Sequence, residues 1–481
     1  MSRINTNVSS MIAVNSLNKN NNALQTSLQR LSTGYRINSG KDDPAGLIAS
    51  ESLKSEQMAT QTAISNAQRA DNIIGTAEGA LGEVSNLLVS MQGLVGDAAN
   101  QAGLSQDEKD ADQLQVDSIL STINRISNSA SFEGVKLLNG TYDYTTSGLS
   151  TASAFTSVSI NSANVGSTAL SVTVAVVASA QTGQLNFAGS STGLNGAASL
   201  SIAGNVGTVQ LSFASSTKSS AIVASVNQFT DSTGVKATLS SDNKSVVFTS
   251  TGYGSSQFVS VTSSNSTAVT TDDVSGNATT SDYGRNATLS VNGAAVESNG
   301  LDVNVVTANF QADFTLASNV NTNGTSKTFG ITGGGATFSL GAQVNTANKA
   351  SIGLGNVNTG SIGKVVQNGT VYSLSDLGSG KSAAVNSGDT SLAQNIVNKA
   401  IQDVSNLRGR LGAFQSNVLG STIDSLNVAM ENVSSSESAI TDTDFATETA
   451  NMTRNQILVQ AADSVLQQAN SAPQNVLKLL G

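Results

Sequence analysis

The chain has 481 residues, of which 38% are hydrophobic, and a formal net charge of −10 at pH 7. It contains no Cys and no His, which excludes disulfides, zinc sites built from these residues, thiol catalysis and any catalytic triad that uses an imidazole. The acidic balance also argues against nucleic acid as a partner. Only carboxylates, Lys, Tyr and hydroxyl groups remain for catalysis, and our expectation is a protein that is not an enzyme and that holds no cofactor or metal.

The first residues, MSRINTNVSSMIAV, contain no apolar segment followed by a small-residue cleavage site. No apolar run in the chain approaches the roughly 20 residues that a membrane span needs. We therefore expect neither a conventional signal peptide nor membrane insertion. The absence of Cys and the abundance of Ser, Thr, Asn and Gly nevertheless suit a protein that works outside the cell.

The first predicted helix carries apolar residues at heptad spacing, with one Asn in the same series: Val14, Leu17, Asn21, Leu24, Leu28 and Leu31. In coiled coils, a single Asn in the seam selects register at a cost in stability. A solvent-facing Asn21 is an equally good interpretation, and the pattern does not decide between the two.

The stretch LSTGYRINSGKDDPAG, at positions 31–46, then interrupts the helical pattern with two glycines, a Lys-Asp-Asp run and a proline. A metal site at Lys41, Asp42 and Asp43 is a weak interpretation, because Mg²⁺ and Ca²⁺ usually need more carboxylates. The stronger interpretation is structural, because a break of this kind between two helical patterns is typical of a joint between helices.

The residue types in this joint support that interpretation. Asp43 precedes Pro44, and the two fit the N-cap and the first residue of the following helix. Gly34 and Gly40 would let the backbone leave helical space without a steric penalty.

The following helix has an apolar seam that advances in alternating steps of three and four residues, which is typical of a coiled coil. Its members are Ala63, Ala67, Ala70, Ile74, Ala77, Leu81, Val84, Leu88, Met91, Val95 and Ala98. Several glycines lie within the same stretch, and each costs about 1 kcal/mol against Ala in a helix interior. We therefore expect that packing holds this helix, with close approach of a neighbouring backbone as the reason for the glycines.

A third helix is expected from about Ser105, where Glu108 would complete a capping box. Its predicted apolar stripe is Val116, Ile119, Ile123, Ile126 and Ala130. Near the other end of the chain the same spacing returns at Val397, Ala400, Val404, Leu407, Leu411, Phe414 and Val418, and again at Ile423, Leu426, Met430 and Val433. A last amphipathic helix is expected from about Asp442 to Asn470, and Pro473 should end it.

The middle of the chain, about 141–381, has few charges and is rich in Ser, Thr, Gly, Asn and Val. Four alternating runs predict strands separated by turns: LSVTVAVVA, VGTVQLSF, KSVVFTST and ATFSLGAQV. A flexible linker is the alternative, but the alternation favours two or three folded β modules. The expected fold class is therefore α+β multidomain, with long antiparallel helices from both termini in a coiled-coil bundle and an inserted β-rich variable region.

The residues at both ends resemble bacterial flagellin, the subunit of the flagellar filament. The N-terminal match includes SLQRLSTGYRINSGKDDPAGL and NAQRADNIIGTAEGAL, and the C-terminal match includes ESAITDTDFATETANMTRNQILVQAADSVLQQAN and APQNVLKLL. Together these matches cover about 1–140 and 392–480. A stretch at about 199–262 is similar to a small β module that is often inserted in flagellins.

The resemblance implies a filament subunit that serves swimming motility and is exported to the outside of the cell. It implies five segments: 1–45, the N-terminal half of an inner tube with its connector; 46–140, the N-terminal part of an outer tube; 141–385, inserted outer domains; 386–435, the C-terminal part of the outer tube; and 436–481, the C-terminal half of the inner tube. A junction protein between hook and filament, or a flagellin with an adhesive, carbohydrate-binding insert, are the alternatives. The APQNVLKLL ending and the large insert favour flagellin.

The resemblance also implies the partners: further copies of the chain, the flagellar cap and hook-junction proteins, the export apparatus, and a cytoplasmic secretion chaperone that binds the C-terminal helix. The residues expected to act in assembly are Ile4, Val8, Leu17, Leu24, Leu28, Leu31, Arg36, Lys41, Asp42, Asp43, Leu458, Val465, Leu466, Val476 and Leu477.

Many flagellins stimulate a Toll-like receptor through a segment that reads approximately QRVRELAVQ and follows EGAL after a spacer. The corresponding positions here are Val89, Ser90, Gln92, Gly93 and Leu94. Both arginines and the acidic residue are replaced, and only the leucine is retained. Because arginine often supplies a hot spot, we expect this chain to stimulate the receptor poorly.

Overall fold

The structure is a computed structural model that describes all residues except 1–5, 101–102, 149–153, 166–167, 188–192, 241–244, 266–269, 274–275, 308, 368–369, 387 and 481. The side chains of residues 473–480 also lie outside the description. The chain forms two compact units, which are considered separately. The first contains Met1–Asp71, Ser339–Asn348 and Ser416–Gly481, and the second contains Asn72–Phe338 and Lys349–Gln415.

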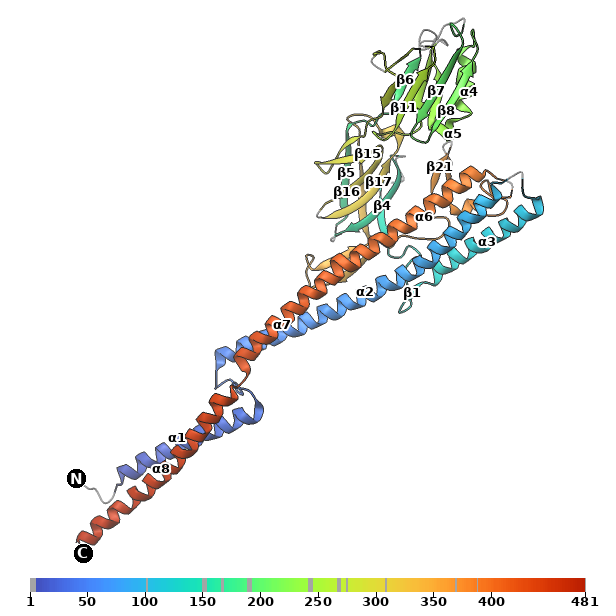
Figure 1. Cartoon of the computed structure of the whole chain (residues 1–481). Helices are drawn as coiled ribbons and strands as arrows, with labels where there is room; N and C mark the ends of the chain where they lie inside the picture. Colours follow the sequence, from blue (N-terminus) through green and yellow to red (C-terminus); the bar gives the residue numbers. More distant parts are fainter. Residues whose placement is uncertain are drawn as a thin grey trace. The chain divides into compact units, whose positions relative to one another are not determined.

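In the first unit, the two ends of the chain form an antiparallel helix pair (Figure 1). The helices of this unit are α1 (Val8–Thr33), the first part of α2 (Pro44–Ala98), α7 (Ser421–Thr441) and α8 (Phe445–Leu480). The Asn7 amide donates to the Ala469 carbonyl at 2.7 Å, whereas Arg30, at the other end of α1, lies 3.6 Å from Glu448. The predicted packing of N-terminal against C-terminal helices is therefore confirmed.

The end of α8 differs from the expectation. The sequence predicts that Pro473 ends the helix, but the helix continues to Leu480, so this prediction is wrong. Proline removes one hydrogen bond and crowds an earlier carbonyl, at a cost of about 3 kcal/mol, yet its fixed φ near −65° is compatible with a helix. A proline within a long helix is therefore unfavourable without being an absolute stop.

The seam of α2 agrees with the prediction. All of its predicted members are buried, and each exposes at most 1% of its surface: Ala63, Ala67, Ala70, Ile74, Ala77, Leu81, Val84, Leu88, Met91, Val95 and Ala98. The explanation offered for the glycines of α2 is wrong, however. A Cβ placed on Gly79, Gly93 or Gly96 would meet no neighbouring atom within 4 Å in the described part of the chain. These glycines therefore lie on the open side of the helix, away from the seam.

α3 (Gln106–Ser129) begins with the predicted capping box, in which the Ser105 backbone N–H donates to Glu108 at 2.7 Å. Of the predicted stripe, Val116 and Ile123 are buried, while Ile119, Ile126 and Ala130 are only half-buried. The buried face is centred slightly to one side of the stripe, and its other members are Gln113, Leu120 and Ser127.

α6 (Thr390–Ala413) passes into α7 through a π-helical segment, η3 (Phe414–Gly420). The predicted α6 seam is buried from Val397 to Phe414, but the next buried residue is Leu419, and the predicted Val418 is only half-buried. A π turn contains one residue more than an α turn needs. The seam therefore moves forward by one residue in this segment.

In the second unit, an eight-stranded antiparallel sheet surrounds one apolar core (Figure 1). In spatial order its strands are β3 (Tyr144–Ser147), β18 (Ser326–Gly334), β5 (Leu170–Ala178), β14 (Thr288–Val291), β15 (Ala294–Asn299), β16 (Asp302–Val306), β17 (Phe310–Leu316) and β4 (Phe155–Ala163). Phe314 and Phe329 are buried in this core, and both rings contact Phe155 edge to face.

A second β module of the same unit contains two four-stranded sheets with a shared core. One sheet has the order β12 (Thr271–Asp272), β6 (Gln184–Phe187), β10 (Val246–Ser250) and β9 (Val235–Leu239). The other has the order β13 (Ser281–Tyr283), β11 (Phe258–Ser263), β7 (Ala198–Gly204) and β8 (Thr208–Phe213). Two helices, α4 (Ser219–Asn227) and α5 (Thr230–Thr233), complete the module.

Three of the predicted strand runs are confirmed in β5, β8 and β10, whereas only the first four residues of the run ATFSLGAQV form a strand, β19 (Ala336–Ser339). The middle of the chain is thus folded, and the linker alternative is wrong. The remaining short elements are β1 (Ser131–Phe132), β2 (Val135–Lys136), η1 (Ser318–Val320), β20 (Lys349–Ile352), β21 (Val365–Gln367), β22 (Thr370–Tyr372) and η2 (Leu374–Leu377).

The described residues of 353–386, which we call the return segment, lead from the sheets back to α6. The segment is held by polar side chains of α3. Gln113 donates to the Leu377 carbonyl at 2.9 Å and accepts from the Val385 N–H at 2.8 Å, and Asn124 accepts from the Thr359 N–H at 3.0 Å. Apolar residues of the return segment are buried as well: Leu354, Val357, Ile362, Leu374, Leu377, Ala383, Ala384 and Val385.

Candidate assembly surfaces and a polar cleft

The connector between α1 and α2 is built against the link between α7 and α8. Gly34 ends α1 with a φ of 78°, which is the left-handed region that glycine adopts readily. Its carbonyl accepts from the Thr443 N–H at 2.8 Å, and the Arg36 N–H donates to the Thr441 carbonyl at 2.7 Å. The Arg36 guanidinium also donates to the Ile440 carbonyl at 2.6 Å. Arg36 therefore contributes a contact within the subunit.

The two aspartates of the connector have structural roles. Asp43 caps α2, since its side chain accepts from the Gly46 N–H at 2.9 Å, as predicted. Asp42 accepts from the backbone N–H groups of Asn38 and Ser39 and from the Ser39 hydroxyl, and these bonds lower the pKa of Asp42. Lys41 is exposed. Within the described residues, no group of three or more carboxylates is arranged to hold a metal ion.

Gly40 does not have the predicted role. Its φ is not positive, and a Cβ at this position would make ordinary contact with Leu47 at 3.5 Å. Of the two glycines only Gly34 has the left-handed backbone, and the turn at 38–42 is closed by the hydrogen bonds to Asp42 instead.

Sequence reasoning missed a further cap at the start of α8. Asp444 accepts from the N–H groups of Ala446 and Thr447 and, at 2.7 Å, from the Thr447 hydroxyl. These bonds, that of the Thr447 side chain first, lower the pKa of Asp444. The signal was present in the sequence as an Asp directly before an apolar-periodic run, but the helix was expected to begin about three residues earlier, near Asp442.

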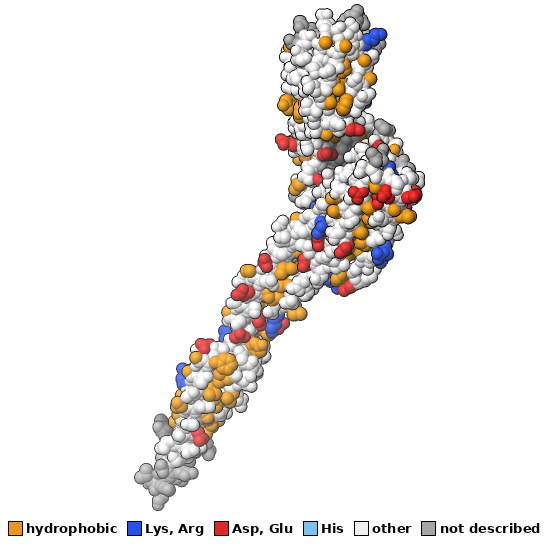
Figure 2. Space-filling model, turned by 45° about the vertical axis from the view of Figure 1, so that its right-hand side comes forward, with side chains coloured by type: hydrophobic (Ala, Val, Ile, Leu, Met, Phe, Trp, Pro, Cys, Tyr) orange, Lys and Arg blue, Asp and Glu red, His pale blue; other side chains and the backbone are white. Residues whose placement is uncertain are grey.

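Apolar side chains remain exposed along the α1–α8 pair (Figure 2). Ile12 is 61% exposed and Val465 is 58% exposed, although both lie where the two helices meet. Together with Ser9, Ala13, Ser16 and Ala462 they line an open apolar groove of about 400 Å³. A helix pair with so much apolar surface in water is incomplete without a further partner.

The predicted assembly residues of these helices differ in exposure. Val8, Leu28, Leu458 and Val465 are exposed, whereas Leu17, Leu24, Leu31 and Leu466 are half-buried. Asn21 is also half-buried, so neither interpretation of this residue is decided. Ile4 and the side chains of Val476 and Leu477 lie outside the described residues.

The five positions aligned with the receptor segment lie on α2. Val89, Ser90 and Gly93 are exposed, and Leu94 is half-buried. Gln92 is half-buried too, because its amide donates to Asn398 of α6 at 2.9 Å. Three of the five positions are therefore open to a partner, and Gln92 is engaged within the chain.

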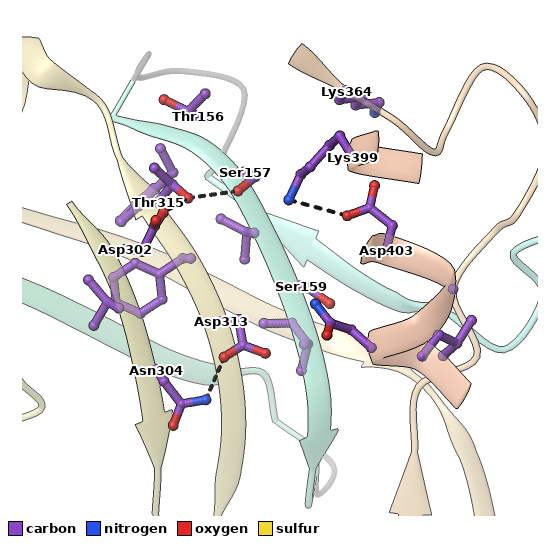
Figure 3. A pocket seen from close by; sticks show the side chains of 18 of the residues that line it. Thr156, Ser157, Ser159, Asp302, Asn304, Asp313, Thr315, Lys364, Lys399 and Asp403 are labelled. Atoms are coloured by element: carbon purple, nitrogen blue, oxygen red, sulfur yellow. Dashed lines mark hydrogen bonds and ion pairs between the residues drawn. The ribbon is translucent and has the colours of Figure 1, made fainter. Parts of the chain in front are cut away.

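A polar cleft of about 1180 Å³ lies in the second unit (Figure 3). One wall is the outward face of β4, β16 and β17. The opposite wall comes from α6 and the return segment, and includes Lys399, whose ammonium lies 3.3 Å from Asp403. Arg410 of α6 connects the two walls, since its guanidinium donates to Asn161 of β4 at 2.6 Å and to the Gly353 carbonyl at 2.8 Å.

Burial shifts the pKa of two charged groups at this cleft, Arg410 and Asp143. Desolvation lowers the pKa of Arg410, and the nearby carboxylates of Asp313 and Asp143 oppose part of this shift. Desolvation also raises the pKa of Asp143, against the effect of the Tyr144 N–H and of Arg410. The arrangement is a set of hydroxyl, amide and carboxylate groups that hydrogen-bond to one another.

Comparison with known proteins identifies the family of each part. A model of the bacterial flagellin N-terminal helical region matches residues 4–143, a model of the C-terminal helical region matches 394–480, and a model of the flagellin hook IN motif matches 199–252. The last match agrees with the predicted inserted β module. In the described part of the chain, no helix is long and apolar enough to cross a membrane.

Similar proteins cover the whole chain. Flagellin D of Vibrio anguillarum is 31% identical over 484 residues, and flagellin of Salmonella typhimurium is 30% identical over 528 residues; both alignments cover 99% of each chain. Among solved structures, the D2–D3 domains of the flagellar cap protein FliD from Escherichia coli are 20% identical, with a TM-score of 0.28. That match covers 40% of this chain and 98% of the other.

Proposed function

Because the chain belongs to the bacterial flagellin family, it is a structural subunit of the extracellular flagellar filament, and we propose that its α1–α8 pair is the surface that seats it among other copies. The filament drives swimming, and the family assembles with other flagellar proteins such as the cap. The connector residues Arg36, Lys41, Asp42 and Asp43 would fix the register of these contacts more than their strength.

The observation that carries this proposal is the open apolar groove on α1 and α8. Ile12 and Val465 expose more than half of their surface in the single chain, which costs free energy in water. The same surface would be covered by the neighbouring helix pairs of a homopolymer. Most of the stability of a helix in a protein comes from packing of its apolar face, so we expect both helices to be largely disordered in the isolated subunit and to fold on assembly.

Polymerisation on filament seeds tests the role of this surface. We expect Val465→Glu to lower the rate of growth by more than about a hundredfold, since burying an unpaired carboxylate costs several kcal/mol. Ser220→Glu adds the same charge at an exposed position of α4 and should polymerise normally. Truncation after Asn470 should also abolish growth. Growth of the Val465→Glu protein at the parental rate would contradict the proposal.

The same surface suits the partners that the subunit meets before assembly. Leu458 and Val465 are seven residues apart and exposed on α8, a spacing that a groove-shaped partner recognises in an amphipathic helix. We therefore assign α8 as the ligand of a cytoplasmic secretion chaperone, before transfer to the export apparatus. Loss of chaperone capture in the double variant Leu458→Glu and Val465→Glu, with retained capture of the parent chain, would support this.

The family is a structural one, and we infer that this chain also has no catalytic role. Without Cys or His, only carboxylates, Lys, Tyr and hydroxyl groups remain for catalysis. The polar cleft of the second unit contains such groups, and the carboxylates of Asp302 and Asp313 accept hydrogen bonds there from Thr315, Asn161 and Asn304.

A further inference from the structure

The outward face of three adjacent strands, which forms one wall of the polar cleft, carries hydroxyl, amide and carboxylate groups. They form two rows across the strands (Figure 3). In the first row, Thr315 of β17 donates to Asp302 of β16 at 2.5 Å, and Ser157 of β4 donates to Thr315 at 3.1 Å. In the second, Asn304 and Asn161 both donate to Asp313, at 2.5 and 2.7 Å.

These carboxylates keep their capacity to accept hydrogen bonds. Among the described residues, neither Asp302 nor Asp313 lies within ion-pair distance of a Lys or Arg side chain. Only one oxygen of Asp302 has a described donor, the Thr315 hydroxyl, and the side chain is exposed. A carboxylate offers about four lone-pair sites, so Asp302 can accept two or more further hydrogen bonds from a molecule in the cleft.

The charges around the cleft select the class of that molecule. A metal ion is disfavoured, because no three carboxylates of the described residues converge. An anion is disfavoured as well, because carboxylates outnumber cations in the lining: Asp143, Glu297, Asp302, Asp313 and Asp403 against Lys364, Lys399 and Arg410. A neutral molecule with many hydroxyl donors satisfies these groups best, because each hydroxyl can donate to a carboxylate and accept from an amide.

We propose that this cleft binds a neutral oligosaccharide, so that the subunit also attaches to polysaccharide. Its volume of about 1180 Å³ exceeds the roughly 300–1,000 Å³ of pockets for drug-sized molecules, which leaves room for several sugar units. Val366 and Val371 are exposed and line the same cleft, where their side chains offer apolar contact to the C–H face of a sugar. The strand residues of the cleft lie outside α1 and α8, so their substitution leaves the contacts of the α1–α8 pair unchanged.

Calorimetric titration of the purified full chain tests the proposal. The probes are hexasaccharides of glucose, mannose and N-acetylglucosamine, with a hexamer of galacturonic acid as the anionic comparison. We expect at least one neutral probe to bind and the anionic probe to bind more weakly. Asp302→Asn removes the charge with little change of shape and should weaken binding at least about tenfold. Asp231→Asn, on the exposed surface of α5, is the matched control and should bind like the parent chain.

Three results would overturn the proposal: no binding of any neutral probe, tighter binding of the anionic probe, or equal binding by the Asp302→Asn and parent chains. Thermal unfolding shows whether Asp302→Asn is folded, and Asn304→Ala takes its place if it is not. Polymerisation of each variant on seeds is measured separately, so that failure of sugar binding is distinguished from failure of assembly.

Discussion

At the scale of single residues, the Asp444 carboxylate makes the stability of the start of α8 dependent on pH. Hydrogen bonds from Thr447 and Ala446 hold its pKa below the ordinary value of 3.8 in the folded chain. A group with a lowered folded-state pKa contributes stability that is present above its unfolded pKa and lost as the pH falls through the folded value. We therefore expect acidification below about pH 4 to weaken this cap.

The substitution Asp444→Asn isolates the effect, because Asn is an equally good N-cap but does not titrate. Between about pH 5 and pH 3, the parent chain should lose more thermal stability than Asp444→Asn, while the other carboxylates titrate alike in both. The measurement is the midpoint of thermal unfolding by circular dichroism at each pH. Parallel curves for the two proteins would show that Asp444 contributes nothing to the acid response.

The positions of α2 that align with the receptor segment can also be tested by substituting single residues. Ser90 and Gly93 are exposed, so Arg and Glu at these positions would be available to a receptor, whereas Arg at position 92 must first replace the bond from Gln92 to Asn398. We expect the combination Ser90→Arg, Gln92→Arg and Gly93→Glu to raise receptor stimulation by monomeric protein about tenfold or more. A reporter-cell assay measures this, and a parent chain as active as an arginine-containing flagellin would refute the expectation of poor stimulation.

At the scale of elements, the π segment η3 accommodates one extra residue between two buried positions of the apolar seam, Phe414 and Leu419. The seam has steps of three and four residues up to Phe414, one step of five to Leu419, and then steps of four and three through Ile423 and Leu426. Deletion of Ser416 should shorten the long step to four residues and allow a continuous α-helix. We expect this variant to unfold within a few degrees of the parent chain.

Deletion of Ser405, an exposed residue in the middle of α6, is the matched comparison for Ser416. It would rotate the following seam by about 100° and bring polar residues into the buried face, so thermal stability should fall by several kcal/mol. If both deletions are equally harmful, the π segment does more than absorb a residue.

The element comparison shows which features the sequence predicts. The α2 seam, the Ser105 capping box and the strand runs of β5, β8 and β10 are local or periodic, and pattern alone locates them. The π segment was missed because it appears only as a change of phase between two good seams. Pro473 was given too much weight, since a long helix can tolerate a proline whose φ is already helical.

At the scale of the whole molecule, the order of helices, β modules and helices was predicted, but two sites were not. The polar cleft depends on side chains from β4, β16, β17 and α6, which lie more than two hundred residues apart in sequence at the extremes. The return segment was assigned to the insert by its composition, yet it is buried against α3 through Gln113. Both depend on tertiary contacts that have no periodic signature.

The return segment determines which part of the insert is dispensable, and this gives the last prediction. The boundary of the insert at 385 stays a prediction. The packing of the return segment favours a deletion that ends earlier, before residue 353. The Leu354 N–H donates to the Tyr142 carbonyl at 2.9 Å, so the chain enters and leaves the β modules at one point. We therefore expect that a short Gly/Ser linker in place of 144–352 leaves a subunit that folds and polymerises on seeds.

Replacing Ser147–Gly380 by the same linker is the comparison, because it also removes Leu354, Leu374 and Leu377, all buried. Losing buried leucines costs roughly 2–5 kcal/mol each, and Gln113 would keep a buried amide without its Leu377 partner. The larger deletion should therefore unfold at a lower temperature and grow poorly on seeds. If instead it polymerises as well as the smaller one, the return segment is part of the dispensable insert; if neither grows, the β modules themselves stabilise neighbouring subunits.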